Sequence, residues 1–140
     1  MRVVIDTNVL VSGADPKDAF HSECRPILEK LLRSEVEAVC PVLVLVEAVC
    51  VLRRRTDDEH IALRFGRSLA LLPSINWLSI TVEDAQRACA LGVKSGLRGG
   101  DAIVLQAAKE WGIPLLTQDR EIKKKAPKDI VVLAPSDFVV

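Results

Sequence analysis

The sequence is poor in aromatic residues: phenylalanine and tryptophan make up 4% of its 140 residues, and tyrosine is absent. Proteins that bind single-stranded nucleic acid without sequence preference stack the bases on aromatic side chains. Two tryptophans and three phenylalanines spread along the chain cannot build such a surface. Trp111, at the end of an apolar segment, is expected in the core instead.

Long hydrophobic runs are also missing. The longest, residues 38–46, stops at Glu47, well short of the roughly 20 apolar residues that a membrane helix needs. Asp6 interrupts the N-terminal apolar run before the core of a secretory signal could form. We therefore expect a cytoplasmic protein with no membrane partner.

The chain has no excess charge of either sign, because 19 Lys and Arg balance 19 Asp and Glu. No overall field draws such a protein toward nucleic acid, so any binding of that kind must come from local clusters of charge. Apolar residues make up 49% of the sequence, which predicts a substantial core. The length suits one domain, taken as residues 1–140.

Paired cysteines and histidines at metal-ligand spacing are absent as well. The four cysteines are Cys24, Cys40, Cys50 and Cys89. No two form a C-x-x-C motif, and we interpret them as buried structural thiols rather than zinc ligands or redox centres. His21 and His60 have no partner at a suitable spacing and are expected to be solvated helix residues.

What the sequence does contain is a series of short segments rich in Val, Ile and Leu, which predict strands buried on both faces. These segments are residues 3–5, 36–39, 76–80, 114–116 and 130–133. Helical periodicity lies between them: one helix is expected to start near Pro26, another at a capping box of Thr81 and Asp84, and a third over residues 101–111. The alternation predicts an α/β fold, a three-layer α/β/α sandwich around a central parallel sheet of about five strands.

Four carboxylates occupy unusual positions in this pattern. Asp6 and Asp119 each follow a predicted strand, Asp101 opens an apolar helix after two glycines, and Glu47 interrupts an apolar run. Each has an alternative explanation. The three aspartates could cap helix N-termini, and the glutamate could lie on a helix surface that is less buried than its neighbours indicate.

Taken together, the four acids predict a cation site. In open parallel sheets, ligands bind beyond the carboxyl ends of the strands. Carboxylates gathered there would repel one another by about 4 kcal/mol per close pair at an effective dielectric constant near 20. Mg²⁺ and Mn²⁺ prefer carboxylate and water ligands, and no set of histidines or thiolates favours zinc. A cation held in this way can activate water and stabilise a phosphate leaving group, which is the chemistry of a phosphodiester nuclease.

Four parts of the chain resemble the PIN domain family and, within it, the VapC-type toxins of prokaryotic toxin–antitoxin pairs. They are VVIDTNVLVSG at residues 3–13, Glu47, GGDAIVLQAA at residues 99–108 and PLLTQDREI at residues 114–122. The resemblance covers essentially the whole chain. It implies a PIN-like parallel sheet in which the first and fourth strands are neighbours, so that Asp6 and Asp119 come together.

The same resemblance implies roles for individual residues. The residues that match the family's acidic quartet for Mg²⁺ or Mn²⁺ are Asp6, Glu47, Asp101 and Asp119. Thr117 matches the hydroxyl of a T-x-D motif and would orient a carboxylate or a water molecule, while Asn8 would help to order the site. Ile122 stands where the family often has an aromatic residue. No member of the metal pattern is missing, which favours an active enzyme.

The implied function is that of a metal-dependent endoribonuclease with an RNA substrate, a small antitoxin partner and a homodimeric assembly. Binding RNA requires cations, and the sequence offers Arg98, close to Asp101, and the two basic runs 53–55 and 123–125. Within the runs the candidate contacts are Arg53, Arg54, Lys123 and Lys124. Such runs can also serve only to solvate a surface.

Other functions stay open at this stage. A phosphatase or phosphotransferase with an aspartyl nucleophile usually needs a second aspartate two residues after the first, where this chain has Asn8. Within the family, a nuclease of ribosomal RNA maturation or RNA decay and a non-catalytic PIN-like scaffold are the alternatives. The small size favours the toxin, and the presence of all four acids favours an enzyme.

Overall fold

A computed structural model describes residues 1–138 and contains one sheet of five parallel strands in the order β3-β2-β1-β4-β5. The strands are β1 (Arg2–Ile5), β2 (Glu37–Pro41), β3 (Ile75–Leu78), β4 (Leu115–Leu116) and β5 (Val132–Leu133). The predicted parallel sheet is therefore confirmed. The first and fourth strands are neighbours, with Val4 opposite Leu115 and Ile5 opposite Leu116.

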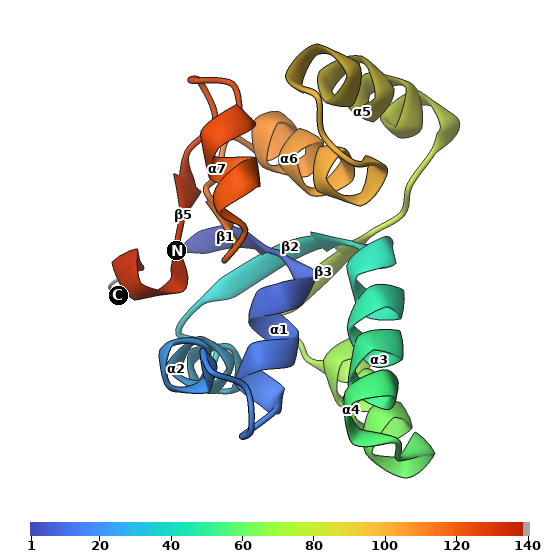
Figure 1. The fold of residues 1–140 in the computed structure, drawn as a ribbon, viewed down its shortest axis with the longest axis vertical. Coiled ribbons are helices and arrows are strands. Elements are labelled where there is room, and N and C mark those ends of the chain that lie inside the picture. Colours follow the sequence, from blue (N-terminus) through green and yellow to red (C-terminus); the bar gives the residue numbers. More distant parts are fainter. Residues whose placement is uncertain (139–140) are drawn as a thin grey trace.

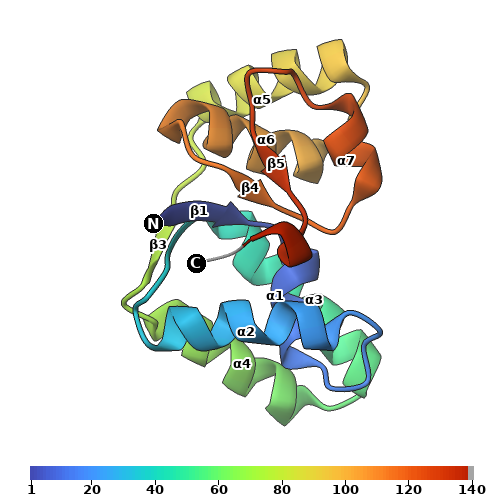
Figure 2. The same cartoon turned by 90° about the vertical axis from the view of Figure 1, so that its left-hand side faces the viewer.

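Helices lie on both sides of this sheet and complete the predicted three layers (Figure 1, Figure 2). On one side are α1 (Thr7–Ala14), α2 (His21–Leu32), α3 (Val42–Thr56) and α4 (Glu59–Leu71), and on the other α5 (Val82–Ser95) and α6 (Gly99–Trp111). The short helices α7 (Arg120–Lys125) and η1 (Pro135–Asp137) follow β4 and β5. Across the described residues, no helix is long and apolar enough to cross a membrane.

Successive helices pack as pairs, and a glycine lies at the crossing of each pair. An added Cβ at Gly13 of α1 would lie 2.8 Å from the side chain of Leu28 on α2. An added Cβ at Gly66 of α4 would lie 2.7 Å from the side chain of Val49 on α3. One at Gly92 of α5 would lie 2.9 Å from Cβ of Ala102 on α6. Contacts this short do not occur between real carbon atoms, so a larger residue at any of the three would push its two helices apart.

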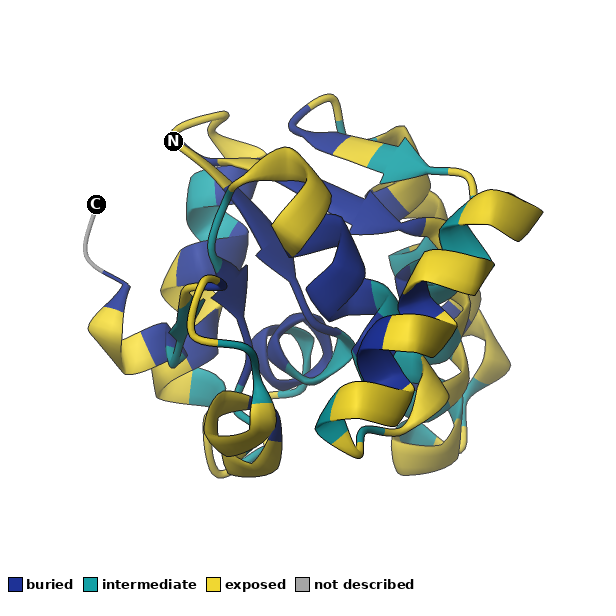
Figure 3. Ribbon diagram, turned by 90° about the horizontal axis from the view of Figure 1, so that it is seen from above, coloured by how far each residue is buried: buried dark blue, intermediate teal, exposed yellow. Residues whose placement is uncertain are grey.

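The core is centred on the two adjacent strands that lead to the candidate site. Residues 3–5 of β1 and both residues of β4 are completely buried. Figure 3 shows central strands in the buried interior, a partly exposed strand at the edge of the sheet, and exposed residues on the outer turns of the helices. The segments that precede Asp6 and Asp119 are therefore among the most tightly packed of the molecule, which fixes the starting point of each acid.

Two of the four cysteines contradict the prediction of buried thiols. Cys24 and Cys40 are buried as expected, and burial raises the pKa of the Cys40 thiol to about 12. Cys50 on α3 and Cys89 on α5 are exposed. Their sequence neighbours are apolar, but adjacent helical residues point in different directions, so Ala88 is buried while Cys89 beside it is exposed.

Trp111 and His21 also differ from the prediction. Trp111 is 38% exposed, because it is the last residue of α6, and the Arg2 guanidinium lies over its ring, 5.9 Å from the centroid. His21 is half-buried rather than solvated, since its Nδ1 lies 2.9 Å from the carbonyl oxygen of Ser12. His60 is exposed, as predicted.

Two helices begin earlier than the sequence indicated. The helix expected near Pro26 starts at His21 and contains the proline in its interior. The loss of one backbone hydrogen bond there is offset by apolar packing along the helix, for example of Leu31, which is completely buried. The helix expected from Asp101 starts at Gly99, so that Arg98 takes the N-cap position.

Candidate acidic site

The four candidate acids come from four separate segments. Asp6 directly follows β1, and Asp119 lies shortly after the end of β4. Because β1 and β4 are parallel neighbours, both acids emerge at the carboxyl edge of the sheet, where α/β proteins bind ligands. Glu47 comes from the middle of α3, and Asp101 from the first turn of α6.

Asp6 is 8% exposed, and its carboxylate accepts three hydrogen bonds. The backbone N–H of Thr7 donates to Oδ1 at 2.8 Å, and the hydroxyl of Thr117 donates to Oδ2 at 2.7 Å. The side-chain amide of Asn8 donates to Oδ2 at 3.4 Å. These donors approach from two segments of the chain, so the orientation of the carboxylate is fixed by both.

Thr117 is 3% exposed, and its hydroxyl connects the two strand-end aspartates. The hydroxyl donates to Asp6 and accepts from the backbone N–H of Asp119 and from Nδ2 of Asn8, both at 3.1 Å. A hydroxyl has one proton and two lone pairs, so this one is fully used. Its single proton must therefore point at Asp6.

Glu47 reaches toward both of the helices that begin at the site. The hydroxyl of Thr7, at the start of α1, donates to Oε1 of Glu47 at 3.4 Å. A Cβ on Gly100, at the start of α6, would lie 3.5 Å from Oε2 of Glu47. The carboxylate thus lies against the residue next to Asp101, and the absence of a side chain at Gly100 leaves it room there.

Repulsion between the acids links them into one electrostatic group. Burial raises the pKa of Asp6 to about 6, and the charges of Asp101 and Glu47 add to this, although the Thr117 and Thr7 hydrogen bonds oppose it. Burial also raises the pKa of Glu47, with a contribution from Asp101. The pKa of Asp101 is raised by burial and by Asp119, against the opposing charge of Arg98.

The alternative role of helix capping holds for two of the aspartates. Oδ1 of Asp6 caps α1, and Oδ1 of Asp119 accepts from the backbone N–H groups of Glu121 and Ile122 at the start of α7. Oδ1 of Asp6 accepts one hydrogen bond and keeps a second lone pair, so capping and a role in cation binding are compatible. Asp101 is no N-cap, because it lies inside the first turn of α6.

The residues present fit a hard divalent cation. The four candidate acids offer carboxylate oxygens, which suit Mg²⁺ or Mn²⁺ rather than zinc. Within residues 1–138, no three His, Cys, Asp or Glu side chains are grouped closely enough to hold a metal ion by themselves. Mg²⁺ commonly keeps several waters and uses one or two carboxylates, and the buried charge of Asp6 is one that such a hydrated ion would stabilise.

The candidate RNA-binding cations differ in their surroundings. Arg98 is exposed and lies near enough to Asp101 to lower the pKa of that carboxyl against the effect of burial. Arg53 forms an ion pair with Asp57 at 2.7 Å. The remaining three candidates, Arg54, Lys123 and Lys124, are exposed, and Lys123 lies 3.7 Å from Asp137. Their contacts with RNA stay a prediction.

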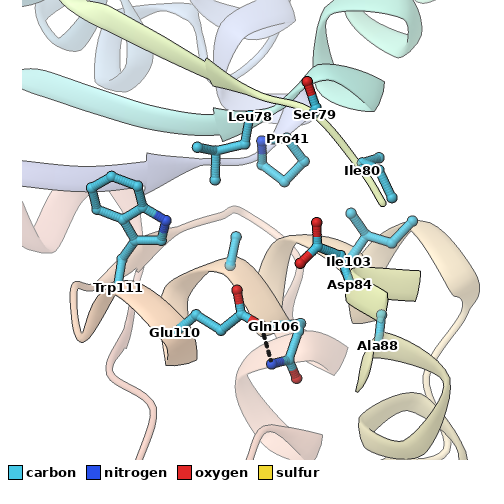
Figure 4. A pocket seen from close by; sticks show the side chains of 11 residues that line it. Pro41, Leu78, Ser79, Ile80, Asp84, Ala88, Ile103, Gln106, Glu110 and Trp111 are labelled. Atoms are coloured by element: carbon cyan, nitrogen blue, oxygen red, sulfur yellow. Dashed lines mark hydrogen bonds between the residues drawn. The ribbon is translucent and has the colours of Figure 1, made fainter. Parts of the chain in front are cut away.

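A hollow of about 190 Å³ lies apart from the four acids, between the ends of β2 and β3 and helices α5 and α6. Figure 4 shows Trp111, Leu78 and Pro41 on one part of its wall and Gln106 near Glu110 on another. Glu110 also binds Arg87, as does Asp84 on the opposite wall. None of the four candidate acids lines this hollow.

The sequence pattern predicted no role for Ser12 and Gln118, which the structure places beside the site. Nε2 of Gln118 donates to the hydroxyl oxygen of Ser12 at 2.8 Å and to the carbonyl oxygen of Asn8 at 3.2 Å. Gln118 stands between the two motif residues Thr117 and Asp119. That position places Gln118 near both motif residues, but the sequence gives no sign of its partners Asn8 and Ser12.

Comparison with known proteins is decisive for the family. The family model described as the PIN domain matches residues 3–128. The chain belongs to the PIN domain family. No curated protein matches it.

Solved structures share the fold of this PIN domain at low sequence identity. Mycobacterium tuberculosis VapC20, a toxin that cleaves the sarcin-ricin loop, is 15% identical with a TM-score of 0.76, covering 91% of this chain and 98% of that chain. A toxin–antitoxin complex from Klebsiella pneumoniae is 21% identical with a TM-score of 0.69, and the match covers 97% of this chain and 99% of that chain. VapBC2 from Rickettsia felis, bound to a promoter DNA fragment, is 14% identical with a TM-score of 0.68, and the match covers 96% of this chain and 98% of that chain.

Proposed function

We propose that this PIN domain is a metal-dependent endoribonuclease and the toxin of a toxin–antitoxin pair. The observation that carries the proposal is the buried Asp6 carboxylate, held by Thr117 and Asn8 at the carboxyl edge of the sheet. Burial and mutual repulsion raise the pKa values of Asp6, Glu47 and Asp101, and a bound cation would offset both effects. The fold of VapC20, a toxin that cleaves the sarcin-ricin loop, supports RNA as the substrate.

In this proposal, Asp6, Asp119, Glu47 and Asp101 would hold Mg²⁺ or Mn²⁺, in part through water molecules that the ion keeps. The bound ion supplies a polarised water and neutralises charge on the phosphate. The protein itself contributes the positions of its ligands: the hydroxyl of Thr117 and the amide of Asn8 hold Asp6 in one orientation. Water adds to phosphorus as it loses a proton, the bond from phosphorus to the leaving sugar oxygen breaks, and that oxygen takes up a proton.

An assay of RNA cleavage with and without chelator tests the proposal. The purified protein is incubated with end-labelled single-stranded and hairpin RNAs, with EDTA and then with excess Mg²⁺ or Mn²⁺. Cleavage is expected to stop with EDTA and to return with either ion. Cleavage that continues in EDTA, or that is absent under every condition, would contradict the proposal.

An antitoxin partner and a homodimer belong to the same proposal. Two of the similar structures are toxin–antitoxin assemblies, from Klebsiella pneumoniae and Rickettsia felis. Expression of the chain together with the short open reading frame next to its gene is expected to yield a stable complex without RNA cleavage. Light scattering of the protein alone gives its oligomeric state, and a mass of one chain would contradict the homodimer.

The cations near the site predict how RNA binding depends on salt. A contact between Arg98 and a phosphate contributes about 0.7 to the slope of log K against log salt concentration for a single strand. Arg98→Ala is expected to reduce the slope by that amount, measured in EDTA so that RNA is not cleaved. Substitution of Lys123 and Lys124 together is expected to reduce it further.

Arg25→Ala is the matched control for this measurement, because Arg25 is an exposed arginine on α2 that pairs with Glu29. Its slope is expected to equal that of the wild type. An unchanged slope for Arg98→Ala would remove Arg98 from the RNA interface.

A further inference from the structure

The two loops that carry Asp6 and Asp119 are joined by one glutamine side chain. The backbone N–H of Gln118 donates to Oδ1 of Asn8 at 3.2 Å, and its Nε2 donates to the carbonyl oxygen of Asn8 at 3.2 Å. Gln118 thus holds both the side chain and the backbone of the residue that follows Asp6 by two positions. The end of β4 is tied in this way to the first turn of α1.

These contacts determine which way the Asn8 amide points. Because a backbone N–H can only donate, the atom of Asn8 that faces it must be the amide oxygen, and Nδ2 then points at Thr117 and Asp6. The hydroxyl of Thr117, which already accepts from the Asp119 backbone, is left with Asp6 as the only target for its proton. The backbone N–H of Gln118 therefore sets which way the Asn8 amide points, and the Gln118 side chain, bonded to the Asn8 carbonyl oxygen, holds that amide within reach of Thr117 and Asp6.

The orientation of the Gln118 amide is determined in the same manner. Its Nε2 faces the carbonyl oxygen of Asn8, which can only accept, so the nitrogen must lie there. This leaves Oε1 buried and without a hydrogen-bond partner, the one such side-chain atom among the described residues. An unpaired buried acceptor lowers the free energy of unfolding by about 1–3 kcal/mol. A protein keeps such a group where its geometry matters more than its contribution to stability.

The contacts of Gln118 continue to the far end of α3. Its second acceptor, the hydroxyl of Ser12, is itself hydrogen-bonded to Asp18, and the guanidinium of Arg55 binds Asp18. Arg55 lies in the last turn of α3, the helix that carries Glu47. A single polar chain thus connects three of the segments that bear the candidate acids.

We propose that Gln118 is a positioning residue of the acidic site, which holds Asn8 and Ser12 and thereby sets the orientation of Thr117 and Asp6 toward the cation. This rests on the proposed function and goes beyond the acids themselves, because Gln118 carries no charge and touches none of the four acid side chains. Loss of a group that orients a metal ligand reduces affinity or activity by about 10–100-fold.

The test compares Gln118→Met with the wild type in two measurements, Mn²⁺ affinity by titration calorimetry and RNA cleavage by kcat and KM. We expect Mn²⁺ binding to weaken and kcat to fall, each by about 10–100-fold, with KM for RNA little changed. Methionine removes two donated hydrogen bonds but also the unpaired acceptor, so the melting temperature is expected to change little. If methionine prevents folding, Gln118→Ala, which cannot overfill the space, takes its place with the same measurements.

Gln106→Met is the matched control, since Gln106 is a buried glutamine whose side-chain amide, like that of the half-buried Gln118, donates a hydrogen bond, here to Glu110 and not to Asn8. It is expected to keep the Mn²⁺ affinity and kcat of the wild type.

Because Gln118 acts through Asn8, Gln118→Met is expected to cause no further loss of Mn²⁺ affinity or kcat in a protein that already carries Asn8→Ala. Additive losses in that cycle, or losses no larger than those of Gln106→Met, would overturn the positioning role while leaving the nuclease proposal intact. A wild-type protein that neither binds Mn²⁺ nor cleaves RNA would instead contradict the nuclease proposal.

Discussion

Asp6→Asn is expected to reduce RNA cleavage by more than about 100-fold and, at the same time, to stabilise the metal-free protein at neutral pH. Removal of a group that only orients a metal ligand already reduces metal affinity or activity by about 10–100-fold. A larger loss is expected for Asp6, because it is the buried carboxylate at the centre of the site. Cleavage is measured with excess Mg²⁺ or Mn²⁺, and stability by thermal unfolding in EDTA.

The gain in stability follows from the sign of the pKa shift. The pKa of Asp6 is raised from 3.8 to about 6 on folding. Ionised Asp6 therefore costs the folded protein about 3 kcal/mol at pH 7. Asparagine removes this cost but weakens the bond from Thr117, which is worth about 1 kcal/mol. A net gain of about 2 kcal/mol is expected, or roughly 6 °C in melting temperature for a chain of this size.

Asp84→Asn is the matched control and should shift stability in the opposite direction. Its pKa is lowered by hydrogen bonds from Thr81 in the capping box of α5, so that its charge stabilises the fold at neutral pH. The variant is expected to cleave RNA normally and to melt at a lower temperature. Equal cleavage by Asp6→Asn and the wild type would refute the site.

Divalent cations are expected to stabilise the wild-type protein at pH 7 and to lose this effect in acid. A ligand at 100 times its dissociation constant adds about 2.7 kcal/mol to the free energy of unfolding, which is roughly 8 °C in melting temperature. Protons compete for the same oxygens. As pH falls through about 6, Asp6 becomes protonated, and the stabilisation by Mg²⁺ or Mn²⁺ should disappear between about pH 6 and pH 4.

The same titration without metal isolates the contribution of Asp6. Since its folded pKa lies above its unfolded value, the folded state binds the proton more tightly, and the stability of the wild type should fall relative to Asp6→Asn as pH rises from about 4 to 6. Stability is measured across that range by thermal or urea unfolding. A melting temperature of Asp6→Asn that rises with Mn²⁺ as far as that of the wild type would show that the ion binds elsewhere.

Much of the site could be predicted because strand ends and buried charges obey simple rules. Asp6 and Asp119 each follow an apolar strand, and parallel neighbours present their carboxyl ends at one edge. Glu47 was singled out by the cost of an unpaired acid in an apolar helix. The structure brings it against Gly100, next to Asp101. Each of these inferences used only local sequence and one geometric rule.

What the sequence left undetermined depends on which direction a side chain faces. Cys50 and Cys89 have apolar neighbours in sequence but lie on the outer surfaces of their helices. Trp111 follows an apolar helix, yet ends it at the surface. Gln118 escaped prediction because its partners Asn8 and Ser12 lie more than a hundred residues away along the chain. No periodicity or motif spacing carries information of that kind.

The placement of β4 beside β1 has a consequence for the synthesis of the protein. Asp6 is synthesised more than a hundred residues before the partner strand and the residues that follow it, Thr117 and Asp119. A contact that spans so much sequence forms late, because the loop it closes must first be ordered. A fragment that stops before residue 115 contains only three of the acids and has no strand to set the first of them in place. If the protein is a ribonuclease, a cell that makes it meets the active enzyme only once residue 119 has been synthesised and β4 has paired with β1.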